Sequence, residues 1–169
     1  MEMPDDKNDI AETTKEILET LLDLMGVSAT VVPLSELITE QEKGVTAGIT
    51  LDVKGDDLGV LIGRRGQTLS CLQYIVRLIV GYQKKVWLPI IIDVEGYKRR
   101  RYEALQALAW RIAEQVKTAG VPFALEPMPA FDRRIIHVTL AEHPDVTTQS
   151  SGEDEERKVV ILPKEQFPD

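Results

Sequence analysis

Two glycines enclose a pair of arginines in the tetrapeptide Gly63-Arg64-Arg65-Gly66. Glycine lets the main chain come close to a ligand because it carries no Cβ atom, and arginine offers charge and forked N–H donors that match phosphate. Gln67 follows at the expected start of a helix, where amide N–H groups present the positive end of the helix dipole. A tight turn between two helices produces the same G-x-x-G pattern, but the two arginines favour a loop that binds the backbone of a nucleic acid.

A second group of candidate binding residues consists of Arg133, Arg134 and His137. On a helix, residues i and i+4 project from the same face, so the guanidinium of Arg133 and the imidazole of His137 can address one phosphate or one base together. On spacing alone we favour a surface histidine without a ligand, because arginine and histidine four residues apart often occur by chance. The surrounding sequence, described below, shifts the interpretation to a binding site.

Positive charge is concentrated in the middle of the chain, although the net charge is −8. Residues 1–42 carry 2 basic and 11 acidic side chains, residues 43–137 carry 15 and 9, and residues 138–169 carry 3 and 8. Lys98 and Arg101 bound a basic run in this middle segment, and we include both among the candidate contacts, although a solvated helix start gives the same pattern. Nucleic-acid binding depends on basic side chains that displace counterions, so we interpret the middle segment as a local binding surface between acidic ends.

The sequence lacks the patterns of common hydrolytic and metal sites. Gly66 is followed by Gln67 and Thr68 with no lysine, so the loop is not a P-loop for nucleotide hydrolysis. Two histidines and one cysteine cannot readily build a zinc site, and no Ser-His-Asp or Cys-His set is indicated. Cys71 allows no internal disulfide, and we expect it to be buried among the apolar residues around it. We therefore expect no enzymatic activity, no metal and no cofactor.

Hydrophobic periodicity predicts the order of elements in the first half of the chain. Helical spacing of apolar residues marks three helices, and alternating or continuous apolar runs mark three strands, with a polar loop at 40–44. Asp56 or Asp57 is expected to cap the second helix, and the strongly apolar third strand is expected to be central. The helices are predicted at 10–25, 58–62 and 67–80, and the strands at 27–32, 46–53 and 86–94.

The second half begins with a long helical pattern at 97–119 that Gly120 ends. After it the sequence predicts a strand, a proline-containing turn, a short helix and two closing strands joined by an acidic hairpin loop. These elements are predicted at 121–125, 126–130, 131–141, 146–149 and 158–162, with the loop at 150–156. We expect two small α+β domains, and assign residues 1–9 to a disordered acidic start, 10–95 and 96–163 to the domains, and 164–169 to a tail.

These motifs resemble two known domains. The order α-β-β-α-α-β with the glycine loop between two successive helices, and the segments 57–69 and 93–97, resemble a type II K-homology (KH) domain. The segments 125–128, 132–137 and 145–152 resemble the R-3-H domain, in which helices lie on a three-stranded sheet. In combination they resemble the Jag family of bacterial RNA-binding proteins, also called SpoIIIJ-associated protein, KhpB or EloR, from about residue 10 to residue 163.

The resemblance implies a protein that binds single-stranded RNA and acts as a post-transcriptional regulator or RNA chaperone linked to cell elongation and envelope synthesis. The loop 63–66 with Gln67 would clamp the RNA backbone, and bases would lie across an apolar groove walled in part by residues 58–62. Arg133, Arg134 and His137 would extend the binding track. Only 5% of the residues are aromatic, so we expect few stacking platforms and loosely specific binding. A non-enzymatic scaffold that pairs through its KH surface, and a binder of single-stranded DNA, remain as alternatives.

The same resemblance implies a protein partner, either a small protein with one KH domain or a second copy of the chain. Many family members carry an additional N-terminal Jag domain and a long charged linker, which we do not expect here, so we do not extend to this chain the roles that depend on that domain. No apolar run approaches the ~20 residues of a membrane span, and residues 1–9 are acidic where a secretory signal would be basic. We therefore expect a cytoplasmic protein.

Overall fold

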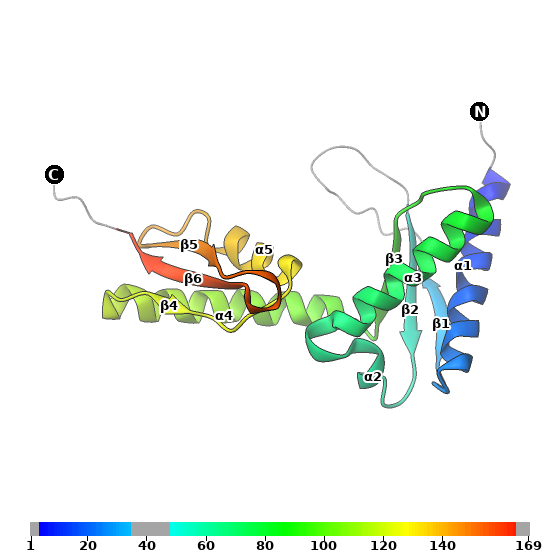
Figure 1. The fold of residues 1–169 in the computed structure, drawn as a ribbon, viewed down its shortest axis with the longest axis horizontal. Coiled ribbons are helices and arrows are strands. Elements are labelled where there is room, and N and C mark those ends of the chain that lie inside the picture. Colours follow the sequence, from blue (N-terminus) through cyan, green and yellow to red (C-terminus); the bar gives the residue numbers. More distant parts are fainter. Residues whose placement is uncertain (1–3, 35–47, 165–169) are drawn as a thin grey trace. The chain divides into compact units, whose positions relative to one another are not determined.

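The computed structural model describes residues 4–34 and 48–164 and has an α+β fold (Figure 1). Contacts divide the chain into two compact units, residues 1–97 and 98–169, and each unit is described by itself. The described residues contain two sheets of three strands, one in each unit. The predicted loop at 40–44 and residues 165–169 of the predicted tail lie outside the described residues. No helix in the described ranges is long and apolar enough to cross a membrane.

The first unit has the order of elements that the sequence predicts, with one 3-10 turn added before the third helix. The elements are α1 (Pro4–Leu24), β1 (Thr30–Leu34), β2 (Ile49–Lys54), α2 (Gly59–Ile62), the 3-10 turn η1 (Arg64–Gly66), α3 (Gln67–Lys84) and β3 (Ile90–Val94). The chain reverses at η1, so the glycine loop lies between the end of α2 and the start of α3.

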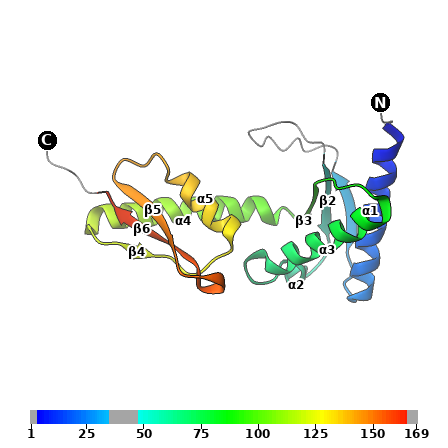
Figure 2. The same cartoon turned by 45° about the horizontal axis from the view of Figure 1, so that its top comes forward.

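The sheet of the first unit has the strand order β1-β2-β3. β1 pairs with β2 in antiparallel register, and β2 pairs with β3 in parallel register, with Val53 between Val31 and Val94. Because side chains alternate along a strand, these valines share one face, and α1 and α3 cover that face with Leu18, Leu22, Leu69 and Val76 (Figure 2). The prediction that β3 is central is wrong: β2 is central, and β3 is apolar because its inner face meets α3.

Three local expectations for the first unit are corrected by the structure. Residues 4–9 are not disordered, because α1 begins at Pro4 and Asp9 forms a 2.7 Å ion pair with Lys84 of α3. Neither Asp56 nor Asp57 caps α2: Leu58 takes the cap position without a side-chain bond. Cys71 is exposed, because the buried stripe of α3 runs through Leu69, Leu72, Val76 and Val80 and leaves residue 71 on the opposite face.

The second unit combines two helices with a small antiparallel sheet. Its elements are α4 (Tyr97–Ala119), β4 (Phe123–Ala124), α5 (Ala130–Thr139), β5 (Val146–Ser151), the 3-10 turn η2 (Asp154–Glu156) and β6 (Lys158–Pro163), with the first residue of α4 counted in the first unit. The strand order is β4-β6-β5. α4 and α5 pack on the sheet through Leu105, Ile112, Ile136, Val146 and Ile161, which are all buried. The sheet thus holds α5 next to β5, where the candidate residues of the second cluster lie.

Candidate nucleic-acid interface

The G-R-R-G loop has a backbone that requires both of its glycines. Gly63 has φ 68° and ψ −170°, and Gly66 has φ 79° and ψ 12°, and these conformations strongly favour glycine. A Cβ atom at residue 63 would overlap the hydroxyl oxygen of Thr68, and one at residue 66 would lie 3.0 Å from Cε1 of Tyr97. The loop is therefore a tightly packed turn with one outer surface.

The two arginines of the loop differ in their surroundings. Arg64 is exposed, and its side chain has no hydrogen-bond or ion-pair partner among the described residues. Arg65 is half-buried and has φ 54°, an uncommon left-handed conformation for a residue with a side chain. The arginine with the clearest access to an outside phosphate is Arg64.

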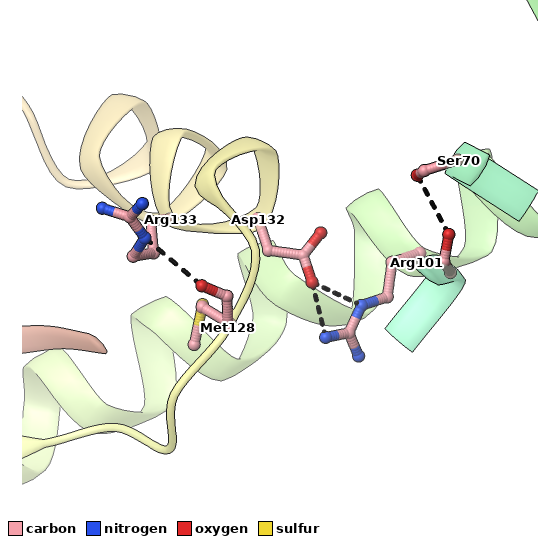
Figure 3. Close-up of polar contacts among 6 residues, drawn as sticks. Ser70, Arg101, Met128, Asp132 and Arg133 are labelled. Carbon is pink, nitrogen blue, oxygen red and sulfur yellow. Dashed lines mark hydrogen bonds and ion pairs between the residues drawn. The ribbon is translucent and has the colours of Figure 1, made fainter. Parts of the chain in front are cut away.

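The loop leads directly into the N-terminus of α3. Gln67 is the first residue of that helix and is exposed, and the Ser70 hydroxyl donates a 3.0 Å hydrogen bond to the Gly66 carbonyl (Figure 3). No side chain caps the helix start, and the Gln67 amide donates to the Arg64 carbonyl, so the amide groups that follow Gln67 in the first turn are the ones that can face an anion. The predicted apolar groove is smaller than expected, because Leu58 and Leu61 belong to the core and only Val60 and part of Ile62 are exposed.

In the second unit, Arg133 and His137 converge on the hydroxyl of Ser150. The Arg133 Nη1 atom donates a 3.3 Å hydrogen bond to Ser150 Oγ, and the His137 Nε2 atom lies 2.9 Å from the same oxygen. His137 Nδ1 lies 2.6 Å from Thr148 Oγ1. The i, i+4 spacing on α5 thus places both side chains on one face, as the sequence predicts, and β5 holds them there.

The surroundings of His137 favour the neutral form of its imidazole. Partial burial is the main cause that lowers its pKa below the ordinary value of 6.5, and the positive charge of Arg133 lowers the pKa further. Arg133 itself is anchored, since its Nε donates a 3.3 Å hydrogen bond to the Met128 carbonyl (Figure 3). A phosphate beside these groups would add negative charge and favour the protonated imidazole.

The basic run that opens α4 is partly engaged within the protein. The Arg101 guanidinium donates hydrogen bonds of 3.1 and 2.7 Å to one carboxylate oxygen of Asp132, whose side chain is buried (Figure 3). Arg99 pairs with Glu103 at 3.8 Å on the helix surface, and Lys98 is half-buried. Arg134, in contrast, is exposed and has no hydrogen-bond or ion-pair partner in the part of the chain that the structure describes. Arg134 is therefore the more accessible cation, and Arg101 secures the start of α5.

His143 follows α5 in a loop, but its side chain is only 4% exposed. Its Nδ1 accepts a 3.2 Å hydrogen bond from the Asp145 amide, and its ring centroid lies 5.3 Å from that of Trp110. The neighbouring Asp145 carboxylate contacts Lys117 at 2.8 Å. This hydrogen bond lowers the pKa of Asp145 and raises the pKa of Lys117. The group fastens the end of α5 to α4.

Sequence reasoning missed Thr148, Ser150 and Tyr97 as supports of the two clusters. Thr148 and Ser150 are two residues apart on β5, so their side chains share one face of the strand. The available signal was the richness in hydroxyl residues of a segment that already carried the resemblance to the R-3-H domain. Tyr97, which packs on Gly66, ends the segment 93–97 that carries the resemblance to the KH domain, but nothing in the sequence indicates its contact with the loop.

The G-R-R-G loop and the cluster around His137 both lie in segments that match known domain families. Residues 15–91 match the KH domain of KhpA and KhpB, and residues 103–163 match the R-3-H domain. The RNA-binding protein KhpB of Clostridium symbiosum is 39% identical over 155 residues, which are 92% of this chain and 67% of that protein. The RNA-binding protein KhpB of Bacillus subtilis is 33% identical over 157 residues, with 92% and 74% covered. The chain belongs to the KhpB family.

A further KhpB protein extends well beyond the segment that is similar to this chain. The RNA-binding protein KhpB of Lactiplantibacillus plantarum is 34% identical over 134 residues, which are 74% of this chain but 42% of that protein. The G-R-R-G loop lies inside the matched KH segment, and Arg133, His137 and Ser150 lie inside the matched R-3-H segment. Membership in the KhpB family thus confirms the predicted family and fold class, whereas the role of each residue stays a prediction.

Proposed function

We propose that the chain binds single-stranded RNA through two surfaces, without catalysing a reaction. The observation that carries the proposal is the exposed Arg64, whose side chain has no partner among the described residues and which lies between two glycines just before the N-terminus of α3, where no side chain caps the helix. Two arginines beside a helix start suit a phosphate backbone and carry no base specificity. Relatives are named RNA-binding proteins, which supports RNA as the ligand.

In the second unit, Arg134 supplies the accessible charge, Arg133 supplies further guanidinium donors, and Ser150 holds both Arg133 and His137 in place. The proposed interface therefore consists of Gly63, Arg64, Arg65, Gly66 and Gln67 in the first unit and Arg133, Arg134 and His137 in the second. Lys98 and Arg101 contribute mainly long-range positive charge, because Arg101 is already bound to Asp132.

The test is binding of a short fluorescent single-stranded RNA, measured by anisotropy over a range of salt concentrations. Arg64→Glu should weaken binding strongly and reduce the salt slope by roughly 0.7 for each phosphate that the variant no longer neutralises. Arg77→Glu is the matched control, since Arg77 is exposed on the same helix α3 and lies about 15 Å along the axis from residue 67. Equal binding by the two variants would show that the loop does not clamp RNA. Single-stranded DNA of the same sequence separates an RNA binder from a general single-strand binder.

For the cell, we propose a cytoplasmic post-transcriptional regulator or RNA chaperone linked to cell elongation and envelope synthesis. Crosslinking in cells followed by sequencing of the bound RNA would name its targets. A set of transcripts unrelated to growth or envelope would overturn the proposed process while leaving RNA binding intact.

A second candidate function, pairing through the KH unit, is favoured by the outer face of α3. Tyr74, Ile75, Leu78 and Tyr82 are exposed there and recur at helical spacing. The partner would be a small KH-domain protein or a second copy of the chain. Sedimentation of the chain, alone and with such a protein, should show a complex that Leu78→Glu abolishes and Arg77→Glu does not. A monomer under both conditions would remove this candidate.

A further inference from the structure

One aromatic side chain on α5 of the second unit is exposed and lies outside the core. Phe131 is the second residue of that helix, and its side chain is 68% exposed. Ile135, Ile136 and Leu140 of the same segment belong to the hydrophobic core of the second unit, whereas Phe131 does not. Single exposed apolar side chains are common in proteins, so what distinguishes Phe131 is its position on α5 together with the proposed contacts Arg133, Arg134 and His137.

Phe131 belongs to an exposed face of α5 that carries a cation in its middle. Residues i, i+3 and i+7 lie on one face of a helix, so Phe131, Arg134 and Val138 form a single line, and all three are exposed. The line is ~10 Å long, about the length of three stacked nucleotides at 3.4 Å each. Arg133 precedes Arg134 directly, so the edge formed by Arg133 and His137 borders this line.

The chemistry of the line fits a single strand better than an apolar protein surface. An aromatic ring offers a stacking surface to any unpaired base, and a guanidinium next to it can contact the adjacent phosphate. The apolar surface consists of one ring and one valine on either side of a charge, which is little area for a protein contact. The two ends of the chain are acidic, but Arg134 makes the charge next to Phe131 positive. This face can therefore attract an RNA strand.

We propose that Phe131 is a base-stacking site of the second unit, with Arg134 contacting the phosphate of the stacked nucleotide. The site extends the proposed function and depends on it. Phe131 lies outside the motifs identified in the sequence, and the proposal gives it a contact with an unpaired nucleobase. This contact adds a stacking surface to a chain with few aromatic residues.

Three substitutions separate stacking from general hydrophobicity, with anisotropy of the same single-stranded RNA as the readout. Phe131→Ala and Phe131→Leu should weaken binding about five-fold or more, the low end of the contribution of one stacked base, whereas Phe131→Tyr should bind like the parent chain. The salt slope should stay unchanged in all three variants because no charge is altered. Phe123→Ala is the matched control, since Phe123 on β4 is also exposed, at 42%.

A strand with abasic positions supplies the second readout. The parent chain and Phe131→Ala should bind the abasic strand equally, because the phenyl ring that the variant lacks would touch only a base. Equal affinity of Phe131→Ala and Phe123→Ala for normal RNA would overturn the stacking site while RNA binding by the parent chain stands. A full effect of Phe131→Ala on the abasic strand would also overturn it. If the parent chain bound no RNA, the proposed function itself would fail.

Discussion

Ser150 joins Arg133 and His137: its hydroxyl oxygen lies 3.3 Å from Arg133 Nη1 and 2.9 Å from His137 Nε2. The contacts fit the neutral imidazole in either tautomer. Either His137 Nδ1–H donates to Thr148 Oγ1 and Ser150 donates to His137 Nε2, or Nε2–H donates to Ser150 Oγ and Thr148 donates to Nδ1, and Arg133 donates to Ser150 in both cases. The arginine and the histidine of the R-3-H helix are therefore positioned by a neighbouring strand as well as by their spacing.

Replacing Ser150 should loosen this arrangement. Ser150→Ala removes the shared hydroxyl, so we expect RNA binding to weaken several-fold and the unfolding free energy to fall by about 1 kcal/mol. Ser151→Ala is the control, because Ser151 is the next residue of β5 and is exposed. Anisotropy and urea unfolding measure the two effects. An unchanged affinity for Ser150→Ala would mean that Arg133 and His137 need no support from β5.

The protonation of His137 should be coupled to RNA binding. Burial and Arg133 lower the pKa of His137 in the free protein below 6.5. Between pH 6.5 and this lowered pKa, the folded state therefore takes up a proton less readily than the unfolded state. Stability should thus be full above pH 6.5 and decline as the pH falls through the lowered pKa. A bound phosphate favours the imidazolium, so binding should tighten over the same fall in pH. NMR titration of the His137 ring with and without RNA checks this, and Arg133→Met should raise the pKa of His137 in the free protein. A pKa of 6.5 or above in the free protein would contradict it.

The loop glycine Gly63 should tolerate no side chain. Gly63→Ala places a Cβ against Thr68 in a conformation that favours glycine, so we expect a loss of roughly 1–3 kcal/mol in the stability of the first unit and weaker RNA binding. Gly59→Ala is the control, because a Cβ there meets no atom within 4 Å and the residue is helical. That variant should gain up to about 0.5–1 kcal/mol. Thermal unfolding of both proteins would show whether the loss is specific to residue 63.

The buried pair of Arg101 and Asp132 should matter for folding. Arg101→Met leaves a buried carboxylate without its partner, so we expect a loss of roughly 2–3 kcal/mol, less than for a fully buried pair because Arg101 is 28% exposed. Arg99→Met removes the equivalent charge from an exposed pair of the same helix and should change stability very little.

The double variant Arg101→Met with Asp132→Leu should recover most of that stability, since it leaves no unpaired charge. Urea unfolding gives the stabilities, and the salt slope of RNA binding shows whether Arg101 contacts phosphate in addition. Stability equal to that of the parent chain in Arg101→Met would refute the structural role.

Most of the order of elements could be predicted because it depends on local periodicity. Apolar spacing of 3.6 residues placed α4 at its observed bounds, and the two predicted closing strands agree with β5 and β6 within two residues. Element ends were less accurate: β3 begins at Ile90 and not at 86, because Val86 and Leu88 pack against the hydrophobic core without joining the strand ladder. The burial of Cys71 was mispredicted for a related reason, since many apolar residues surround it in sequence but lie on both faces of α3.

The sequence by itself determined the two motifs, because each is short and local. Gly63 and Gly66 specify the turn through their backbone freedom, and Arg133 and His137 share a face through helical spacing. Only the tertiary structure decided which cations remain accessible. Arg101 meets Asp132, 31 residues away, and His137 meets Ser150, 13 residues away, because packing of α4, α5 and β5 brings these positions together. Contacts over such separations depend on how helices and strands pack, and no local period in the sequence encodes them.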